Sequence, residues 1–130
     1  AAETGHLVLS TLQTSDTVSS LSRITDVFPA AQQQQIRMFL AENLQGVISQ
    51  LLIPRQDKQE RIVATEVLVG TPAVSNLIRH GNFQQISVAI ETGARYGMHL
   101  MDTSIERLCQ EGIISREKAA LYAKDPTKFI

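Results

Sequence analysis

The side chains best suited to chemistry in the first part of the chain are polar groups that follow an apolar run. Residues 7–12 have the composition of a buried strand, and Thr11 and Gln13 lie at its carboxyl end. In nucleotide-binding α/β proteins, ligands bind at the carboxyl ends of strands. A glutamine amide can donate to a phosphate oxygen or orient a water molecule, but unlike histidine it carries no transferable proton.

Helices and a hairpin are expected to position this edge. Residues 1–3 resemble the last turn of a helix that stops at Gly5, and Ser15 or Asp16 can cap a helix running to about residue 27. Pro29 starts a second helix. Residues 47–53 and 62–69 are β-rich and, with a polar connection between them, predict an antiparallel hairpin. Glu66 interrupts the second strand, and we expect it on a face turned to water.

From Thr71 onward every pattern is helical. Thr71 caps a helix that ends at Gly81, and Asn82 with Gln85 resembles a capping box for a helix that stops at Gly93. Two further helices are expected, one with a buried stripe ending near residue 112 and one running from about residue 115 to 123. The chain thus divides into an α/β portion, residues 1–70, and a helical portion, residues 71–130.

Composition narrows the function classes. The chain has 130 residues, 43% of them hydrophobic, and a net charge of −1 without a basic cluster, which argues against nucleic acid as a partner. No apolar run approaches the roughly 20 residues of a transmembrane helix. The single cysteine, Cys109, excludes an intramolecular disulfide and a cysteine-rich zinc site, and it fits a reducing cytoplasm. His80 and His99 are isolated, so no metal site is predicted.

Two segments resemble motifs of one protein family. Residues 5–14 read Gly-His-Leu-Val-Leu-Ser-Thr-Leu-Gln-Thr, which is similar to the histidine box Gly-His-Leu-Val-x-x-Thr-Leu-His-Thr of the secretion and pilus ATPases. Gln13 replaces the second histidine of that box. Residues 72–80 resemble the Ala-Ile-Arg-Asn-Leu-Ile-Arg-Glu motif of the pilus-retraction (PilT) ATPases, with Ser75 in place of its first arginine and His80 in place of its glutamate. The matching residues are Ala73, Asn76, Leu77, Ile78 and Arg79.

The resemblance covers essentially the whole chain and favours the retraction branch. Residues 23–29, 45–50, 90–93 and 112–117 also look like family blocks, in the family's order. Assembly ATPases typically insert a tetracysteine zinc module between the hairpin strands, whereas residues 55–61 here contain no cysteine.

The resemblance implies the carboxy-terminal part of a RecA-like P-loop ATPase core followed by a small all-helical subdomain. The whole protein would be a homohexameric motor that uses ATP and Mg²⁺ to retract type IV pili at the cytoplasmic face of the bacterial inner membrane. Its partners would be neighbouring subunits and the pilus platform protein. No Gly-Lys pair occurs, so the phosphate-binding loop is missing. We therefore expect this chain by itself to bind no nucleotide, to contain no complete catalytic set and to hydrolyse no ATP.

The resemblance also suggests roles for individual residues. His6, Thr11 and Gln13 would sense nucleotide, and Arg23 or Arg37 could reach a neighbouring subunit's phosphates. The motif that includes Asn76 and Arg79 would contact a partner through a patch that is partly apolar. The plainer alternatives are a solvated glutamine, a histidine held by backbone carbonyls, solvated arginines and ordinary helix packing. Cys109 is expected to be inert.

Two other functions compete with the motor. Residues 108–120 could form a helix-turn-helix that reads DNA. Only Arg116 and Lys118 supply positive charge there, beside Glu111 and Glu117, which is little for binding phosphates. The remaining alternative is an oligomerisation scaffold.

Overall fold

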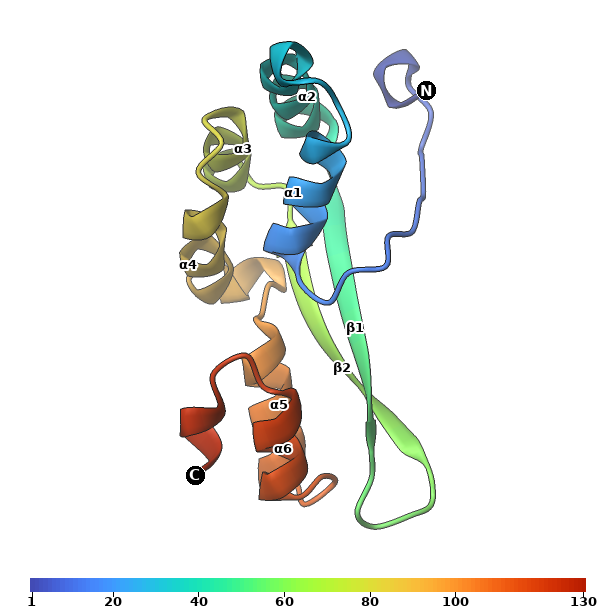
Figure 1. Ribbon diagram of the computed structural model, residues 1–130, viewed down its shortest axis with the longest axis vertical. Helices are drawn as coiled ribbons and strands as arrows, with labels where there is room; N and C mark the ends of the chain where they lie inside the picture. The colour runs from blue at the N-terminus through green and yellow to red at the C-terminus, as the bar shows by residue number, and fades with distance from the viewer.

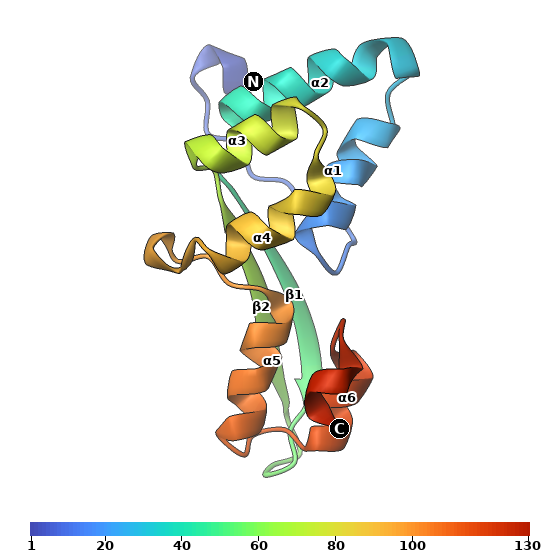
Figure 2. The same ribbon diagram turned by 90° about the vertical axis from the view of Figure 1, so that its left-hand side faces the viewer.

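The computed structural model describes all 130 residues. Its sheet is a two-stranded antiparallel hairpin, and the helices pack against it. Strand β1, Gly46–Pro54, pairs with β2, Arg61–Val69, in a register that places Gly46 opposite Val69 and Pro54 opposite Arg61. The helices lie along one face of this long hairpin (Figures 1 and 2). The predicted hairpin and the α/β class are therefore confirmed.

The helices before the hairpin begin where the sequence predicts. Helix α1, Thr17–Asp26, is capped by Asp16, whose Oδ1 accepts from the Ser19 amide at 2.7 Å. Helix α2, Ala30–Asn43, starts directly after Pro29. The proline fits there because the first amides of a helix have no intrahelical acceptor.

The helices after the hairpin are short, and two of the four are capped by hydroxyls. Thr71 caps α3, Pro72–Arg79, and Ser115 caps α6, Arg116–Tyr122. Between them lie the turn η2, Phe83–Gln85, then α4, Ile86–Glu91, the turn η3, Ala94–Tyr96, and α5, Met101–Gln110; the turn η4, Pro126–Phe129, follows α6. The predicted capping box at Asn82 is wrong. Its side chain makes no cap bond, because the chain turns there as a 3₁₀ helix in which the Gln85 amide donates to the Asn82 carbonyl.

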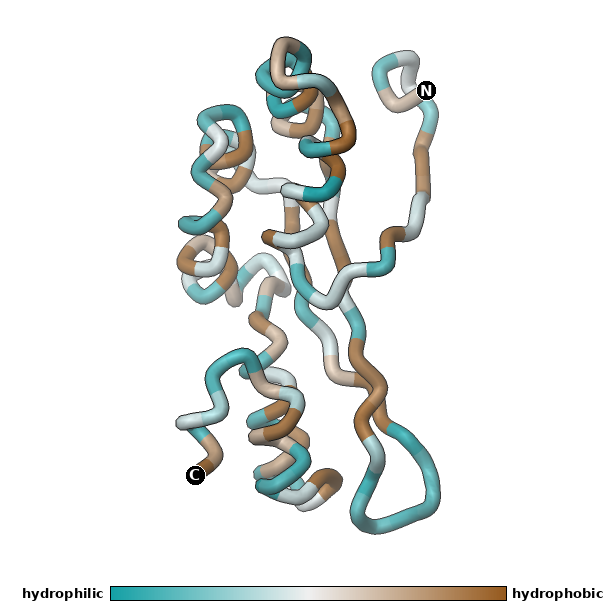
Figure 3. Tube along the Cα trace, in the orientation of Figure 1, coloured by the Kyte–Doolittle hydropathy of each residue, from teal (hydrophilic) through white to brown (hydrophobic).

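Two apolar clusters pack against the hairpin. The first joins α1, α2, the end of β2, α3 and α4; the second joins the far part of the hairpin to α5, α6 and Phe129. Strand β2 contributes Leu68 to the first and Ala64 to the second. Figure 3 shows the apolar colour along both strands and the polar hairpin tip. Each cluster draws residues from both sides of residue 70, and the division into residues 1–70 and 71–130 stays a prediction.

The hairpin tip is tied to the turn between α5 and α6. The Gln56 amide donates to the Ile113 carbonyl at 2.9 Å, and Gln56 Nε2 donates to the Gly112 carbonyl at 2.8 Å. Within the tip, Arg55 makes a bidentate ion pair with Asp57, with both N–O distances 2.7 Å. These bonds fix the polar loop at the hairpin tip.

The apolar segment 7–12 does not form the predicted buried strand. After the turn η1, Ala2–Thr4, and Gly5, whose φ is +87°, the chain runs extended beside β1 without joining the sheet (Figure 1). Leu7 is 81% exposed and Leu9 is 87% exposed. A strand obtains its backbone hydrogen bonds from a neighbouring strand. The outer edge of β1 is open, but residues 7–12 make no backbone hydrogen bond to it, so the segment stays outside the sheet.

None of the helices combines the length and apolar character needed to cross a membrane.

Candidate functional site

The residues predicted to sense nucleotide lie along the extended segment before α1. His6, Thr11 and Gln13 are all exposed. His6 Nδ1 is 3.0 Å from the Thr4 hydroxyl, so its contact is local. Arg23 of α1 reaches back to Gln13 and donates from Nη1 to its carbonyl oxygen at 3.5 Å. The structure thus brings Gln13 and Arg23 together and leaves His6 apart from them.

Hydrogen bonds to α1 hold the turn that follows Gln13. The hydroxyls of Thr14 and Ser20 are hydrogen-bonded to each other, and Ser20 also donates to the Asp16 carbonyl at 3.0 Å. Asp16 Oδ2 lies 3.9 Å from Lys124 Nζ, close to the carboxyl end of the chain. The Gln13 backbone is therefore positioned by α1, while its side-chain amide is exposed to solvent.

Arg37 lies in a different environment from Arg23. It is half-buried on α2, and a Cβ added to Gly81 would lie 3.4 Å from its Cδ and Nε atoms. Its Nε atom is buried without a hydrogen-bond partner. Arg37 therefore packs beside the end of α3, and the structure does not bring the two arginines into one site.

The motif on α3 divides into a buried face and an exposed face. Ile78 is buried in the first cluster, and Leu77 packs partly against that cluster. Ala73, Asn76 and Arg79 are exposed. The expectation of an exposed apolar patch needs correction, because the large apolar side chains of the motif pack inward. The solvent-facing surface is instead small, polar and cationic.

Glu66 is the main residue whose environment the sequence interpretation missed. It is 6% exposed, so it does not face water as expected. Its Oε1 accepts from the Thr17 amide at 3.0 Å, and its Oε2 accepts from the Met101 amide at 3.1 Å. The strand period could have located it, because Glu66 shares a face with the buried residues Ala64 and Leu68.

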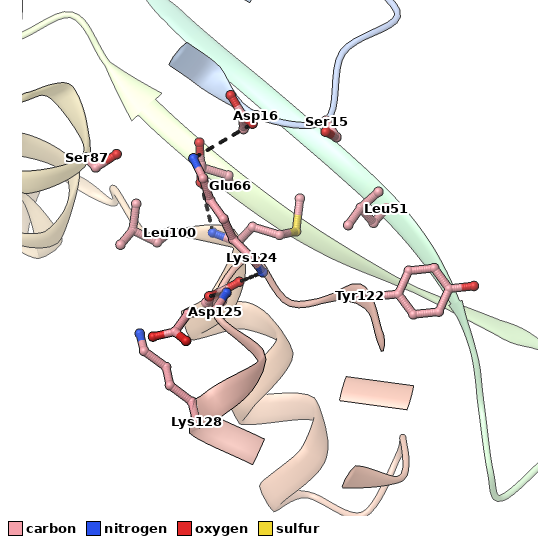
Figure 4. A pocket seen from close by; sticks show the side chains of 12 residues that line it. Ser15, Asp16, Leu51, Glu66, Ser87, Leu100, Tyr122, Lys124, Asp125 and Lys128 are labelled. Carbon is pink, nitrogen blue, oxygen red and sulfur yellow. Dashed lines mark hydrogen bonds and ion pairs between the residues drawn. The ribbon is translucent and has the colours of Figure 1, made fainter. Parts of the chain in front are cut away.

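A second buried carboxylate follows directly on α5. Asp102 accepts from the Lys124 amide at 2.8 Å and from the Asp125 amide at 2.9 Å. Glu66 and Asp102 both border a cleft of about 310 Å³, which Asp16 and Lys124 also line (Figure 4). All four carboxylate oxygens of Glu66 and Asp102 already accept backbone amides, so the polar groups of this cleft act mainly to join elements. No group of three or more potential metal-binding side chains occurs in the chain.

Comparison with known proteins assigns the family. The model of the Type II/IV secretion system protein family matches residues 1–120. The chain belongs to this family. The type IV pilus retraction ATPase PilT of Pseudomonas aeruginosa is 45% identical over 129 residues, which are 99% of this chain and 37% of that protein. The twitching motility protein of Neisseria gonorrhoeae is 42% identical over 125 residues, 96% of this chain and 33% of that protein.

Two solved structures share the fold of this chain. The crystal structure of the pilus retraction motor PilT with bound ADP superposes with a TM-score of 0.87 and 38% identity, over 98% of this chain and 35% of that one. The Yersinia pseudotuberculosis ATPase DotB superposes with a TM-score of 0.78 at 20% identity, over 99% of this chain and 32% of that one, which shows a shared fold. The chain spans about a third of the length of these secretion-family relatives.

Proposed function

We propose that this chain is part of an ATP-driven motor that retracts type IV pili. The observation that carries the proposal is the 45% identity to the P. aeruginosa retraction ATPase over nearly the whole chain. The TM-score of 0.87 with the ADP-bound retraction motor supports it. In this proposal the chain completes a RecA-like core and a helical subdomain, within a homohexamer that acts with the platform protein at the cytoplasmic face of the inner membrane.

The residues present fit only one side of a nucleotide site. Bound Mg²⁺–ATP would supply the phosphoanhydride bond whose hydrolysis drives the motor. The chain has no Gly-Lys pair to bind the phosphates, so we propose that it neither binds nor hydrolyses ATP by itself. It does supply the exposed Gln13 amide, which can orient a water molecule or donate to a phosphate oxygen. Arg23 would hold the Gln13 backbone or act as a cation toward a neighbouring subunit.

Other predicted residues have subsidiary places in this proposal. His6 and Thr11 would contact nucleotide or a neighbouring subunit from the same exposed segment. Arg37 is a weaker candidate for a cation acting between subunits than Arg23, because it packs against Gly81. The exposed face of α3, formed by Ala73, Asn76 and Arg79, would transmit motion to a neighbouring subunit or partner.

The Gln13→Ala substitution in the longer parent protein tests the role of this residue. Losing the amide removes water or phosphate positioning, so we expect kcat for ATP to fall at least about tenfold, as on loss of a positioned hydrogen-bond donor, while the Kd for nucleotide changes little. Turnover is measured by Mg²⁺-dependent phosphate release. Gln34→Ala, at an exposed glutamine on α2, is the matched control and should leave kcat unchanged. Unchanged turnover in Gln13→Ala would contradict the role of Gln13.

The expected inactivity of the 130-residue chain alone has its own test. Mg²⁺-dependent phosphate release by this chain would contradict it.

The structure offers little support for the DNA-binding alternative. The turn between α5 and α6 is hydrogen-bonded to Gln56 of the hairpin tip, and both helices pack against the hairpin through the second cluster. The motor therefore explains more of the molecule than a helix-turn-helix or a scaffold does.

A further inference from the structure

Glu66 joins the beginnings of two helices that are distant in the sequence. Thr17 is the first residue of α1 and Met101 is the first residue of α5. Amides at such positions have no acceptor within their own helix. One carboxylate satisfies both of them, with N–O distances of 3.0 Å and 3.1 Å. Glu66 itself is on β2, so three elements meet at this side chain.

The surroundings leave the two amides no evident protein substitute for Glu66. Thr17 is fully buried, Met101 is 6% exposed, and Ser49, opposite Glu66 in the hairpin, is also buried. Glu66 is the one protein acceptor of these two amides, and water reaches the junction from the cleft that Glu66 and Met101 line. A carboxylate also suits the position because helix amino termini carry partial positive charge.

Further contacts connect this junction to the end of the chain. Directly after Met101, Asp102 holds the amides of Lys124 and Asp125, and Lys124 Nζ lies 3.9 Å from Asp16 Oδ2. Asp16 caps α1 just after the Gln13 turn. Figure 4 shows Asp16, Glu66, Lys124 and Asp125 around the same cleft. The Gln13 turn is thus linked to the carboxy-terminal helices by a buried bridge and an exposed ion pair.

We propose that Glu66 is a positioning residue that makes the Gln13 turn, α1 and α5 move as one unit. A displacement at the turn would then reach α5 and the helices after it through the two hydrogen bonds of one side chain. The inference rests on the proposed function, because it takes the Gln13 turn as the part of the chain that responds to nucleotide. The coupling itself is a property of the chain and can be measured without nucleotide.

The first measurement is hydrogen exchange at the two amides in the 130-residue chain. Glu66→Gln keeps the size of the side chain but turns an NH₂ group toward one of the two donors. We expect exchange of the Thr17 or Met101 amide to accelerate by roughly 10- to 100-fold, the range that follows from losing a hydrogen bond to a charged group. Asp102→Asn is the matched control and should accelerate the Lys124 or Asp125 amide instead. Unchanged exchange at both Thr17 and Met101 would overturn the proposal.

The second measurement tests transmission. Asp16→Ala removes the α1 cap, and we expect it to shift the NMR resonance of the Met101 amide when Glu66 is present but not in the Glu66→Gln background. Lys124→Gln removes the exposed ion pair and should leave that response intact. A Met101 response that is equal in both backgrounds, or absent from both, would overturn the proposal. If Glu66→Gln does not fold, Glu66→Asp replaces it, since the shorter carboxylate cannot span both amides.

The two hypotheses fail separately. A Met101 response to Asp16→Ala that is absent although Glu66 is present would refute the coupling and leave the motor assignment intact. An inert Gln13→Ala in the parent protein would refute the sensing role while leaving the measured coupling in place.

Discussion

At the scale of single residues, carboxylates organise this molecule mainly by accepting backbone amides. Asp16 caps α1, Glu66 joins the starts of α1 and α5, Asp102 holds the chain after α6, and Asp125 caps the last turn. Charged acceptors make stronger hydrogen bonds than neutral ones, which suits positions where a helix start must be fixed. The carboxylates at the cleft are therefore committed to structure.

The hairpin tip allows a prediction about pH. A side-chain hydrogen bond from Arg55, aided by its charge, holds the pKa of Asp57 below its ordinary value of 3.8. Because the folded pKa is lowered, the stabilising contribution of Asp57 is complete above the unfolded pKa and is lost as pH falls through the folded pKa. We expect the ¹³C carboxyl resonance of Asp57 to titrate below pH 3.8. Arg55→Met should return this pKa toward its ordinary value.

The control for this titration is Lys58→Gln. Lys58 acts on Asp57 only through its charge and contributes least to the lowered pKa, so this variant should move the Asp57 titration much less than Arg55→Met. An Asp57 titration that does not respond to Arg55→Met would show that the ion pair is absent in solution.

At the scale of elements, close backbone contacts fix how the hairpin meets the helices. Gly70 connects β2 to α3 and lies against the connection between α2 and β1. Its amide donates to the Gln45 carbonyl at 2.9 Å, and a Cβ at Gly70 would lie 2.2 Å from the Leu44 carbonyl oxygen. This contact sets the spacing of α2 and α3, on which the first cluster depends.

We expect Gly70→Ala to destabilise the chain by about 3 kcal/mol, because a backbone atom must move to admit the methyl group. Gly93→Ala is the comparison. Its Cβ would also fall 2.2 Å from a neighbour, but that neighbour is the flexible end of Met98, and the nearest backbone atom, the Ala89 carbonyl oxygen, is 3.0 Å away, so a smaller cost of about 1–2 kcal/mol is expected. Urea unfolding of both variants measures the difference. A cost for Gly70→Ala no larger than that for Gly93→Ala would contradict this account.

At the scale of the whole molecule, two clusters share one hairpin. Leu68 and Ala64 lie on the same face of β2 but belong to different clusters, and Glu66 lies between them. The continuous strand and the Glu66 bridge should make the clusters unfold together, as small domains usually do.

We expect Ile78→Ala, in the first cluster, and Ile105→Ala, in the second, each to cost about 2–5 kcal/mol. In either variant, hydrogen exchange should lose protection in both clusters at one urea midpoint. Conservative controls are Ile78→Val and Ile105→Val, which should cost about 1 kcal/mol. Loss of protection confined to one cluster would show that the two clusters unfold as separate units.

Local patterns by themselves determined the helices, the hairpin and most of the caps. The cap residues Asp16, Thr71 and Ser115 each act on an amide three residues away, so neighbouring sequence is enough to predict them. The same holds for the polar turn of the hairpin. The family resemblance in residues 5–14 and 72–80 was also readable in this way.

Only the tertiary structure decided where residues with distant partners lie. Residues 7–12 have strand composition, yet they remain exposed and make no backbone hydrogen bond to either strand of the hairpin. Arg23 lies by Gln13, whereas Arg37 packs against Gly81. Glu66 is buried between two donor amides, which lie 49 and 35 residues away from it in the sequence. A charged side chain is stable inside only where such donors converge, and that convergence is a property of the folded chain.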